Sequence, residues 1–253
     1  MKPALLYGNG PRKAIVMNGW LGCAANWQSM LEAVDPTAFE LAVFDYRGYG
    51  TRRDTVGAYT FEEAAQDVLA LADQMSWDRF ALIGHSMGGM AIQRVALEAP
   101  GRVDGLLGLA PVSAAGSCLS GDRLKLFEQA VTDESVRQRI VDFSTGGRLS
   151  AAWCVAMARA AGSAHLPQAM LAYLMQWGQS DFAEQARTLA LPTRVIVGQH
   201  DPSINMVSVA TTWLVHHPHA SVVEVFGVGH YLMQEAPASV GSAVERWLTN
   251  LKL

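Results

Sequence analysis

The stretch of sequence that decides the fold is Phe80-Ala81-Leu82-Ile83-Gly84-His85-Ser86-Met87-Gly88. Its first four residues are an apolar run typical of a buried strand, and a helical pattern follows and ends before Pro100. The chain must therefore reverse abruptly at the motif G-x-S-x-G, with Ser86 at the turn in a strained backbone conformation. Glycines on both sides of the turn leave room for close-packed neighbours.

The same alternation of predicted strands and helices continues on both sides of this turn. Further apolar runs that end at Gly, Asp, Asn or Pro predict strands at residues 14–17, 41–44, 103–109, 193–197 and 221–225. Helical patterns cover about 60–76, 206–216 and 238–251, and Thr60-Phe61-Glu62-Glu63 reads as a capping box at the start of the first. This alternation predicts an α/β fold with a mostly parallel central sheet and helices on both faces.

Residues 113–182 interrupt this alternation of strands and helices, because they contain helical patterns and no strand-like run. We expect them to form a helical cap inserted after the fourth long strand, with residues 1–112 and 183–253 forming the core. The segment carries several large apolar side chains, among them Trp153, Met170 and Trp177. Most are expected to pack the cap onto the core, and a few to line an apolar pocket.

Composition argues against several classes of protein. A chain of 253 residues suits one large domain, and with half of its residues hydrophobic and 17% charged it is not a disordered chain. Its net charge is −4 and it has no run of Lys or Arg, which argues against a nucleic-acid partner. No stretch is long and apolar enough to suggest a membrane span, and no secretory signal is expected.

The cysteines point to a reducing compartment. Cys23, Cys118 and Cys154 form neither a disulfide framework nor a metal-binding pattern, so reduced thiols in a cytoplasmic protein are expected, with no metal. The sequence gives no indication of the oligomeric state.

A serine hydroxyl needs a base to accept its proton and a third group to orient that base. His230, in Gly227-Val228-Gly229-His230-Tyr231, follows the last predicted strand, and Asp201 follows the strand at 193–197. Both therefore lie at the carboxyl ends of strands, as Ser86 does, and the order Ser, Asp, His is the one that accompanies G-x-S-x-G. We predict that Ser86 is the nucleophile, His230 the base and Asp201 the orienting acid.

Other acids and histidines fit these roles less well. Asp45 reads as part of a structural turn, and Glu235 comes after the base and precedes the last helix, whose positive end favours a carboxylate. The tight turn is expected to direct His85 away from the serine. A cluster of histidines at the end of a helix is expected to be solvated rather than to bind a metal: His216, His217 and His219.

A tetrahedral intermediate also needs donors for its oxyanion. The backbone N–H of Met87 is the first expected donor. The second is expected from Asn18-Gly19-Trp20-Leu21-Gly22, the loop after the first long strand, and Trp20 is preferred over Leu21.

Taken together, these motifs resemble the capped members of the α/β-hydrolase family. The matching segments are Asn18-Gly19-Trp20, Asp45-Tyr46-Arg47-Gly48-Tyr49-Gly50, Gly84-His85-Ser86-Met87-Gly88, Gly198-Gln199-His200-Asp201 and Gly229-His230. The resemblance implies an eight-stranded, mostly parallel sheet, catalysis without a cofactor, and a covalent acyl-enzyme. Two features depart from it: Asn18 stands where the family usually has His, and the short region before the first long strand requires abbreviated opening strands.

The resulting hypothesis is a serine hydrolase that cleaves a carboxylic ester, thioester or lactone of a small, apolar substrate. A serine at the turn argues against the dehalogenases and epoxide hydrolases of the family, which use Asp there. Carbon–carbon bond hydrolases and perhydrolases keep Ser and stay open as alternatives, as does a non-catalytic ligand receptor on the same fold.

Overall fold

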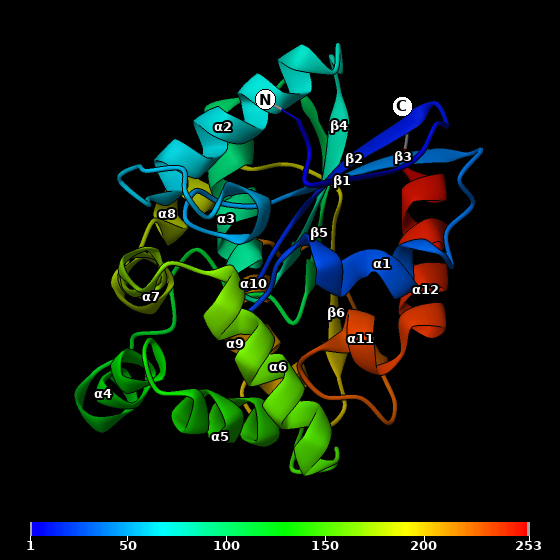
Figure 1. Ribbon diagram of the computed structural model, residues 1–253. Helices are drawn as coiled ribbons and strands as arrows, with labels where there is room; N and C mark the ends of the chain where they lie inside the picture. The colour runs from blue at the N-terminus through cyan, green and yellow to red at the C-terminus, as the bar shows by residue number, and fades with distance from the viewer. Residues whose placement is uncertain (1, 252–253) are drawn as a thin grey trace.

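A single seven-stranded sheet forms the centre of the protein in a computed structural model that describes residues 2–251 (Figure 1). Its strands lie in the order β1-β3-β2-β4-β5-β6-β7, and only β1 is antiparallel to its neighbour. The bounds are β1 (Leu5–Gly8), β2 (Arg12–Met17), β3 (Phe39–Phe44), β4 (Phe80–His85), β5 (Val103–Leu109), β6 (Thr193–Gly198) and β7 (Ser221–Val225).

The predicted fold class is confirmed, with one difference in the sheet. Each of the six predicted strands is present, whereas β1 carried no sequence signal, since its side chains are only partly buried. The resemblance implied eight strands, and the described residues form seven, with β1 as the abbreviated antiparallel opening.

Alternating side chains of the strands build two hydrophobic layers, one on each face of the sheet. Ile15 and Leu82 face one layer, and Val16 and Ile83 face the other. The first layer is covered by α2 (Phe61–Gln74), α3 (Met87–Glu98), α8 (Ala183–Ala186), α9 (Met206–Thr211) and α10 (Trp213–His216). The second is covered by η1 (Ala24–Trp27), α1 (Gln28–Leu31), α11 (Leu232–Glu235) and α12 (Pro237–Asn250).

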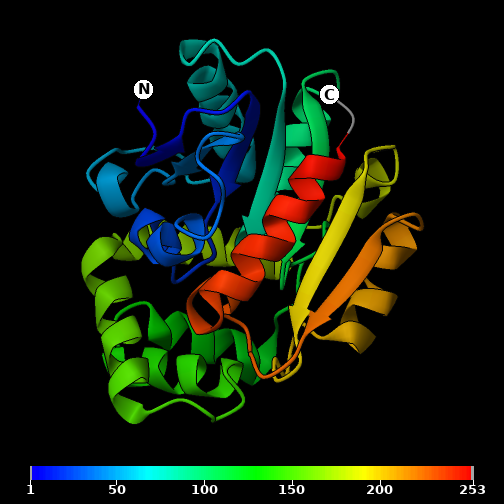
Figure 2. The same cartoon turned by 90° about the vertical axis from the view of Figure 1, so that its right-hand side faces the viewer.

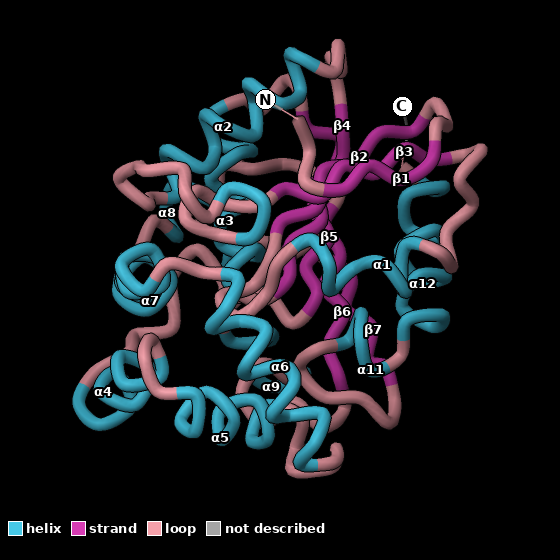
Figure 3. Tube along the Cα trace, in the orientation of Figure 1, coloured by secondary structure: helices cyan, strands magenta, loops and turns pink. Residues whose placement is uncertain are grey.

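Four further helices lie between β5 and β6 in the chain and gather at the carboxyl end of the parallel strands (Figure 2). They are α4 (Gly121–Ala130), α5 (Glu134–Ser144), α6 (Ala151–Ala164) and α7 (Pro167–Gln179). In Figure 3 this part of the trace is helix and loop only. Within residues 2–251, no helix is both long enough and apolar enough to span a membrane.

Aromatic side chains attach these four helices to the rest of the protein. The Trp20 indole Nε1 donates a 2.8 Å hydrogen bond to the Met170 carbonyl of α7, and its ring contacts Phe127 and Trp177 edge-on. His165 stacks on Tyr49 with ring centroids 3.9 Å apart. Through these contacts, the segment of helices α4 to α7 packs against the loops at the carboxyl ends of the strands.

Two local predictions were wrong in detail. The helix expected over 206–216 is divided into α9 and α10, because Thr212 leaves the helical region with φ −121° and ψ −77°. Thr60 accepts from the Glu63 amide as predicted. The Glu63 carboxylate, however, accepts from the amides of Ala58 and Tyr59 rather than from Thr60, since the chain turns at Tyr59, whose φ is positive.

The predicted solvated histidine cluster is also wrong for His217, whose side chain is buried against α3. Its Nε2 donates to the Gln93 side-chain oxygen at 2.9 Å. Burial, followed by the neighbouring charge of His216, lowers the pKa of His217 to about 4. His85 and His165 are buried as well, and burial lowers their pKa values to about 3 and about 4.

These buried histidines predict a loss of stability in acid. Below their ordinary pKa of 6.5 they take up protons in the unfolded chain, whereas in the folded protein they stay neutral down to about pH 4 or lower. The unfolded state therefore binds more protons, and each histidine lowers the unfolding free energy by up to about 1.4 kcal/mol per pH unit as the pH falls. Urea unfolding at pH 6.5, 5.5 and 4.5 measures this slope. His217→Gln is expected to flatten it, and an unchanged slope in that variant contradicts the assignment.

Candidate active site

Ser86 lies at the junction of β4 and α3 in a backbone conformation that few residues adopt, with φ 52° and ψ −119°. The turn is held by a 3.0 Å hydrogen bond from the Ser86 amide to the Leu109 carbonyl. A Cβ on Gly84 would come within 2.2 Å of the Gly88 carbonyl oxygen, so the backbone crosses itself where a side chain cannot fit. A strained serine in a glycine-flanked turn is the geometry that the motif predicts.

The close packing of this turn predicts a large cost for a single methyl group. A Cβ on Gly88 would approach the Met17 carbonyl oxygen to 2.4 Å, and backbone cannot yield as a flexible side chain can. Gly88→Ala is expected to lower the unfolding free energy by about 3 kcal/mol. Gly101→Ala is the matched control, because no heavy atom lies within 4 Å of its Cβ position. Equal urea midpoints for the two variants would contradict the prediction.

The structure brings Asp201 and His230 together from loops after β6 and β7. His230 Nδ1 and Asp201 Oδ2 are 2.6 Å apart, and the backbone amides of Ser203 and Ile204 each donate to Asp201 Oδ1 at 2.9 Å. Burial opposes ionisation of Asp201, but the His230 charge and these hydrogen bonds outweigh it and hold the pKa of Asp201 below its ordinary value. An ionised Asp201 requires the proton on His230 Nδ1, which leaves Nε2 as the basic nitrogen.

His85 does not point away from the site as expected. Its Nε2 donates to the His230 carbonyl oxygen at 2.9 Å, and its buried ring lines the same pocket as Ser86. With its pKa lowered to about 3 by burial, and secondarily by His230, the ring stays neutral. His85 therefore holds the His230 backbone without adding charge.

Glu235 occupies a different place from the one expected before the last helix. Its side chain is 1% exposed, and it accepts hydrogen bonds from the amides of Gly229 and Tyr231 on either side of His230. The Arg148 guanidinium forms an ion pair with it at 3.0 Å. The carboxylate therefore belongs to the His230 loop rather than to the amino end of α12.

The loop after β2 lies directly against the serine. A Cβ on Gly19 would meet the Ser86 Cβ at 3.0 Å and the His85 ring at 2.7 Å, so glycine is what allows this approach. Among the hydrogen bonds of residues 2–251, the amides of Trp20, Leu21 and Met87 have no protein acceptor. None of these three N–H groups is therefore committed to another group of the described protein, which the predicted role of the Trp20 and Met87 amides as oxyanion donors requires.

Asn18 fixes the base of this loop from a fully buried position. Its Nδ2 donates to the Phe44 carbonyl and to Asp45, and its Oδ1 accepts from the Trp27 indole at 2.6 Å. Asp45 also accepts from the amides of Ala24 and Thr51, which agrees with its reading as a structural turn residue.

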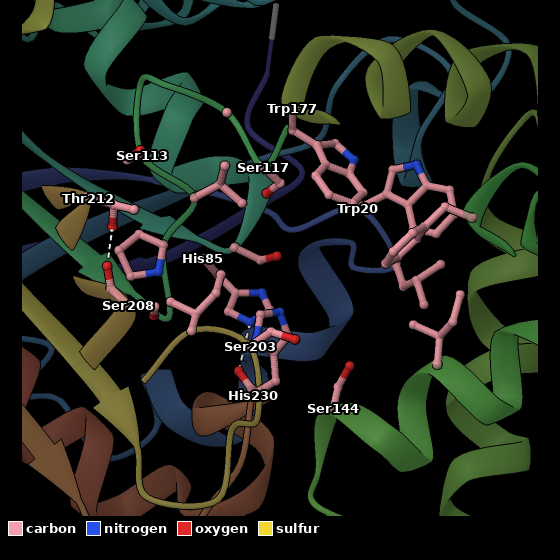
Figure 4. Close-up of a pocket in the computed structure, with 18 of the residues that line it drawn as sticks. Trp20, His85, Ser113, Ser117, Ser144, Trp177, Ser203, Ser208, Thr212 and His230 are labelled. Atoms are coloured by element: carbon pink, nitrogen blue, oxygen red, sulfur yellow. Dashed lines mark hydrogen bonds between the residues drawn. The ribbon is translucent and has the colours of Figure 1, made fainter. Parts of the chain in front are cut away.

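A cavity of about 340 Å³ opens over Ser86 and His230 (Figure 4). In the close-up, Trp20 and Trp177 stand on one side of His230, and Ser113, Ser208 and Thr212 stand on the other. Large apolar side chains that line the cavity are Trp20, Leu21, Val112, Phe127, Ile140, Trp177 and Ile204. Hydroxyl side chains that line it are Ser86, Ser113, Ser117, Ser144, Ser203, Ser208, Thr212 and Tyr231.

Comparison with known proteins shows the family to which this fold belongs. A family model described as "alpha/beta hydrolase fold" matches residues 15–237, which is most of the chain. The chain belongs to the α/β-hydrolase family. A solved structure supports the fold: the bromoperoxidase from Bacillus anthracis superposes with a TM-score of 0.83 at 19% identity, over 97% of this chain and 94% of that one.

Two curated relatives of this α/β-hydrolase have named activities. A pimeloyl-[acyl-carrier protein] methyl ester esterase of Pectobacterium carotovorum is 34% identical over 151 residues, a match that spans 57% of each chain. A 3-oxoadipate enol-lactonase 2 of Acinetobacter baylyi is 26% identical over 249 residues, covering 94% of this chain and 90% of the relative.

Sequence reasoning missed three features of this α/β-hydrolase site. The hydroxyl-lined side of the cavity comes from loops and from α9, where isolated Ser and Thr residues carry no pattern. The contact of His85 with His230 depends on how two loops meet. The contact of Glu235 with Arg148 joins residues 87 positions apart, and the only local signal was a carboxylate close to the base.

Proposed function

We propose that this protein is a serine hydrolase that cleaves a carboxylic ester, thioester or lactone. The observation that carries the proposal is the Asp201–His230 pair, 2.6 Å between oxygen and nitrogen, with His230 in the cavity that Ser86 also lines. A base oriented by a buried carboxylate beside a strained serine is the constellation of acyl transfer. The names of the two curated relatives, a methyl ester esterase and an enol-lactonase, point to the same bond type.

In this proposal Ser86 Oγ attacks the carbonyl carbon while His230 Nε2 takes its proton. The oxyanion that forms accepts hydrogen bonds from the Met87 amide and from the Trp20 amide in the loop after β2. Collapse of the intermediate expels the alcohol or thiol, which receives the proton from His230, and the acyl group stays on Ser86. Water then attacks the acyl-enzyme by the same route, and the acid leaves.

The cavity supports a small substrate with an apolar part. Residues 113–182 act as the cap over the core of 1–112 and 183–253, and Phe127, Ile140 and Trp177 of the cap face the cavity. Burial of an acyl chain or alcohol group against these side chains supplies affinity, and a volume of about 340 Å³ suits a short chain.

Labelling with a fluorophosphonate and turnover of a panel of 4-nitrophenyl esters test the proposal. One equivalent of phosphonate is expected on Ser86, together with a preference for short acyl chains. A vinylogous diketone in the same panel separates ester cleavage from carbon–carbon cleavage. Absence of label on Ser86 would refute the hydrolase function, and faster turnover of the diketone than of every ester would replace it with the carbon–carbon alternative.

A further inference from the structure

The backbone around His230 is held by acceptors on both sides. Three consecutive N–H groups, those of Gly229, His230 and Tyr231, each donate to an acceptor outside these three residues. Glu235 Oε2 accepts from Gly229 at 2.7 Å, and Glu235 Oε1 accepts from Tyr231 at 3.0 Å. The Ser144 carbonyl accepts from His230 at 3.0 Å. One carboxylate therefore spans the residues on both sides of the proposed base.

The partner of that carboxylate comes from the cap. Arg148 lies in the loop between α5 and α6, and its Nη1 donates to Glu235 Oε2 at 3.0 Å and to the Thr145 carbonyl at 3.2 Å. Its Nη2 donates to the Gly227 carbonyl, at the start of the His230 loop. The guanidinium thus joins the cap loop to both ends of the turn that carries His230.

The two segments also touch through their backbones. A Cβ on Gly229 would come within 2.7 Å of the Thr145 Cα. The absence of a side chain at Gly229 therefore allows the backbone of the His230 loop to pack closely against that of the cap loop. The Ser144 side chain, one residue before Thr145, lines the cavity. Residues 144–145 of the cap therefore contact the backbone of the His230 loop, and Ser144 also faces the cavity in which a ligand would bind.

We propose that Glu235 and Arg148 are positioning residues that hold His230 in place for proton transfer. Through them, the position of His230 depends on the contact between the cap and the His230 loop. The proposal rests on the hydrolase function proposed above. Neither side chain is among those that line the cavity, so they act on the reaction through His230 and not through substrate binding. A displacement of the base by about 1 Å can cost on the order of 100-fold in rate.

Glu235→Gln is the sharpest test, because it keeps the shape and removes one acceptor. A glutamine has a single side-chain oxygen, so its NH₂ group must face one of the two amide donors or Arg148. We expect kcat to fall by about 10- to 100-fold while KM stays within about twofold.

Arg148 variants test the cap side of the same contact. Arg148→Ala is expected to lower kcat by about 10-fold, and Arg148→Lys to recover part of that loss, because an ammonium keeps the charge but not the fork of donors. Arg159→Ala is the matched control, because it removes another cap arginine, which is exposed and pairs with Glu134 at 3.3 Å. This control is expected to keep wild-type kcat.

A spectroscopic readout separates positioning from general stability and from the function itself. The low-field NMR resonance of the His230 Nδ1 proton reports the Asp201 contact without any substrate. It is expected to broaden or shift in Glu235→Gln and Arg148→Ala, and to stay unchanged in Arg159→Ala. If Glu235→Gln does not fold, Arg148→Ala carries the test alone.

Wild-type kcat and an unchanged resonance in both variants would overturn the proposal, as would a loss of activity through KM only. The proposed function fails separately, if the wild-type protein neither hydrolyses esters nor reacts with the fluorophosphonate. In that case the resonance still tests whether Glu235 and Arg148 place His230.

Discussion

Replacement of Ser86 by alanine is expected to lower kcat for ester hydrolysis by about 10⁶-fold, since the acyl-enzyme can no longer form. The residual rate should still exceed the uncatalysed one by about 10³-fold, because the proposed oxyanion donors and the cavity stay in place. Steady-state kinetics on the best ester of the panel measure both quantities.

Ser163→Ala is the control for this experiment. Its hydroxyl is exposed on α6, where it donates to the Arg159 carbonyl, and the variant is expected to keep full activity. A Ser86→Ala protein that retains more than about 1% of the wild-type kcat would show that another residue is the nucleophile.

Asp201→Asn is expected to lower kcat by about 10⁴-fold with the fold intact. The amides of Ser203 and Ile204 both donate to one carboxylate oxygen, so the oxygen of an asparagine must stay there. Its NH₂ group then faces His230 Nδ1 and forces the proton to Nε2, which removes the basic nitrogen that Ser86 needs.

Asp54→Asn is the matched control, because Asp54 is 92% exposed and pairs with its neighbour Arg53. The test is a comparison of kcat for the two variants. Urea unfolding establishes in addition that the Asp201→Asn protein is folded. An Asp201→Asn kcat within tenfold of wild type would mean that His230 does not depend on this carboxylate.

The sequence was sufficient to predict the fold class and the strands that carry the site. Buried parallel strands read as continuous apolar runs, and each of the six predicted runs is a strand in the sheet. The candidate site residues Ser86, Asp201 and His230 were predicted from their order in the chain and from their positions just after strands. The structure places Asp201 beside His230, and His230 lines one cavity with Ser86.

What the sequence could not predict depends on contacts between distant segments. The burial of His217 requires α3 to supply Gln93, which lies 124 positions away. The two amides held by Glu235 are brought to one carboxylate only by the turn into α11. No periodicity marks such contacts, because each joins single residues of loops rather than faces of helices or strands.

Trp20 has two attachments, one through its backbone and one through its side chain. Its backbone stands in the loop beside Ser86, while its indole is tied to the Met170 carbonyl of α7. This hydrogen bond joins residues 150 positions apart in the chain, so a single indole anchors α7 to the loop that lies against the serine.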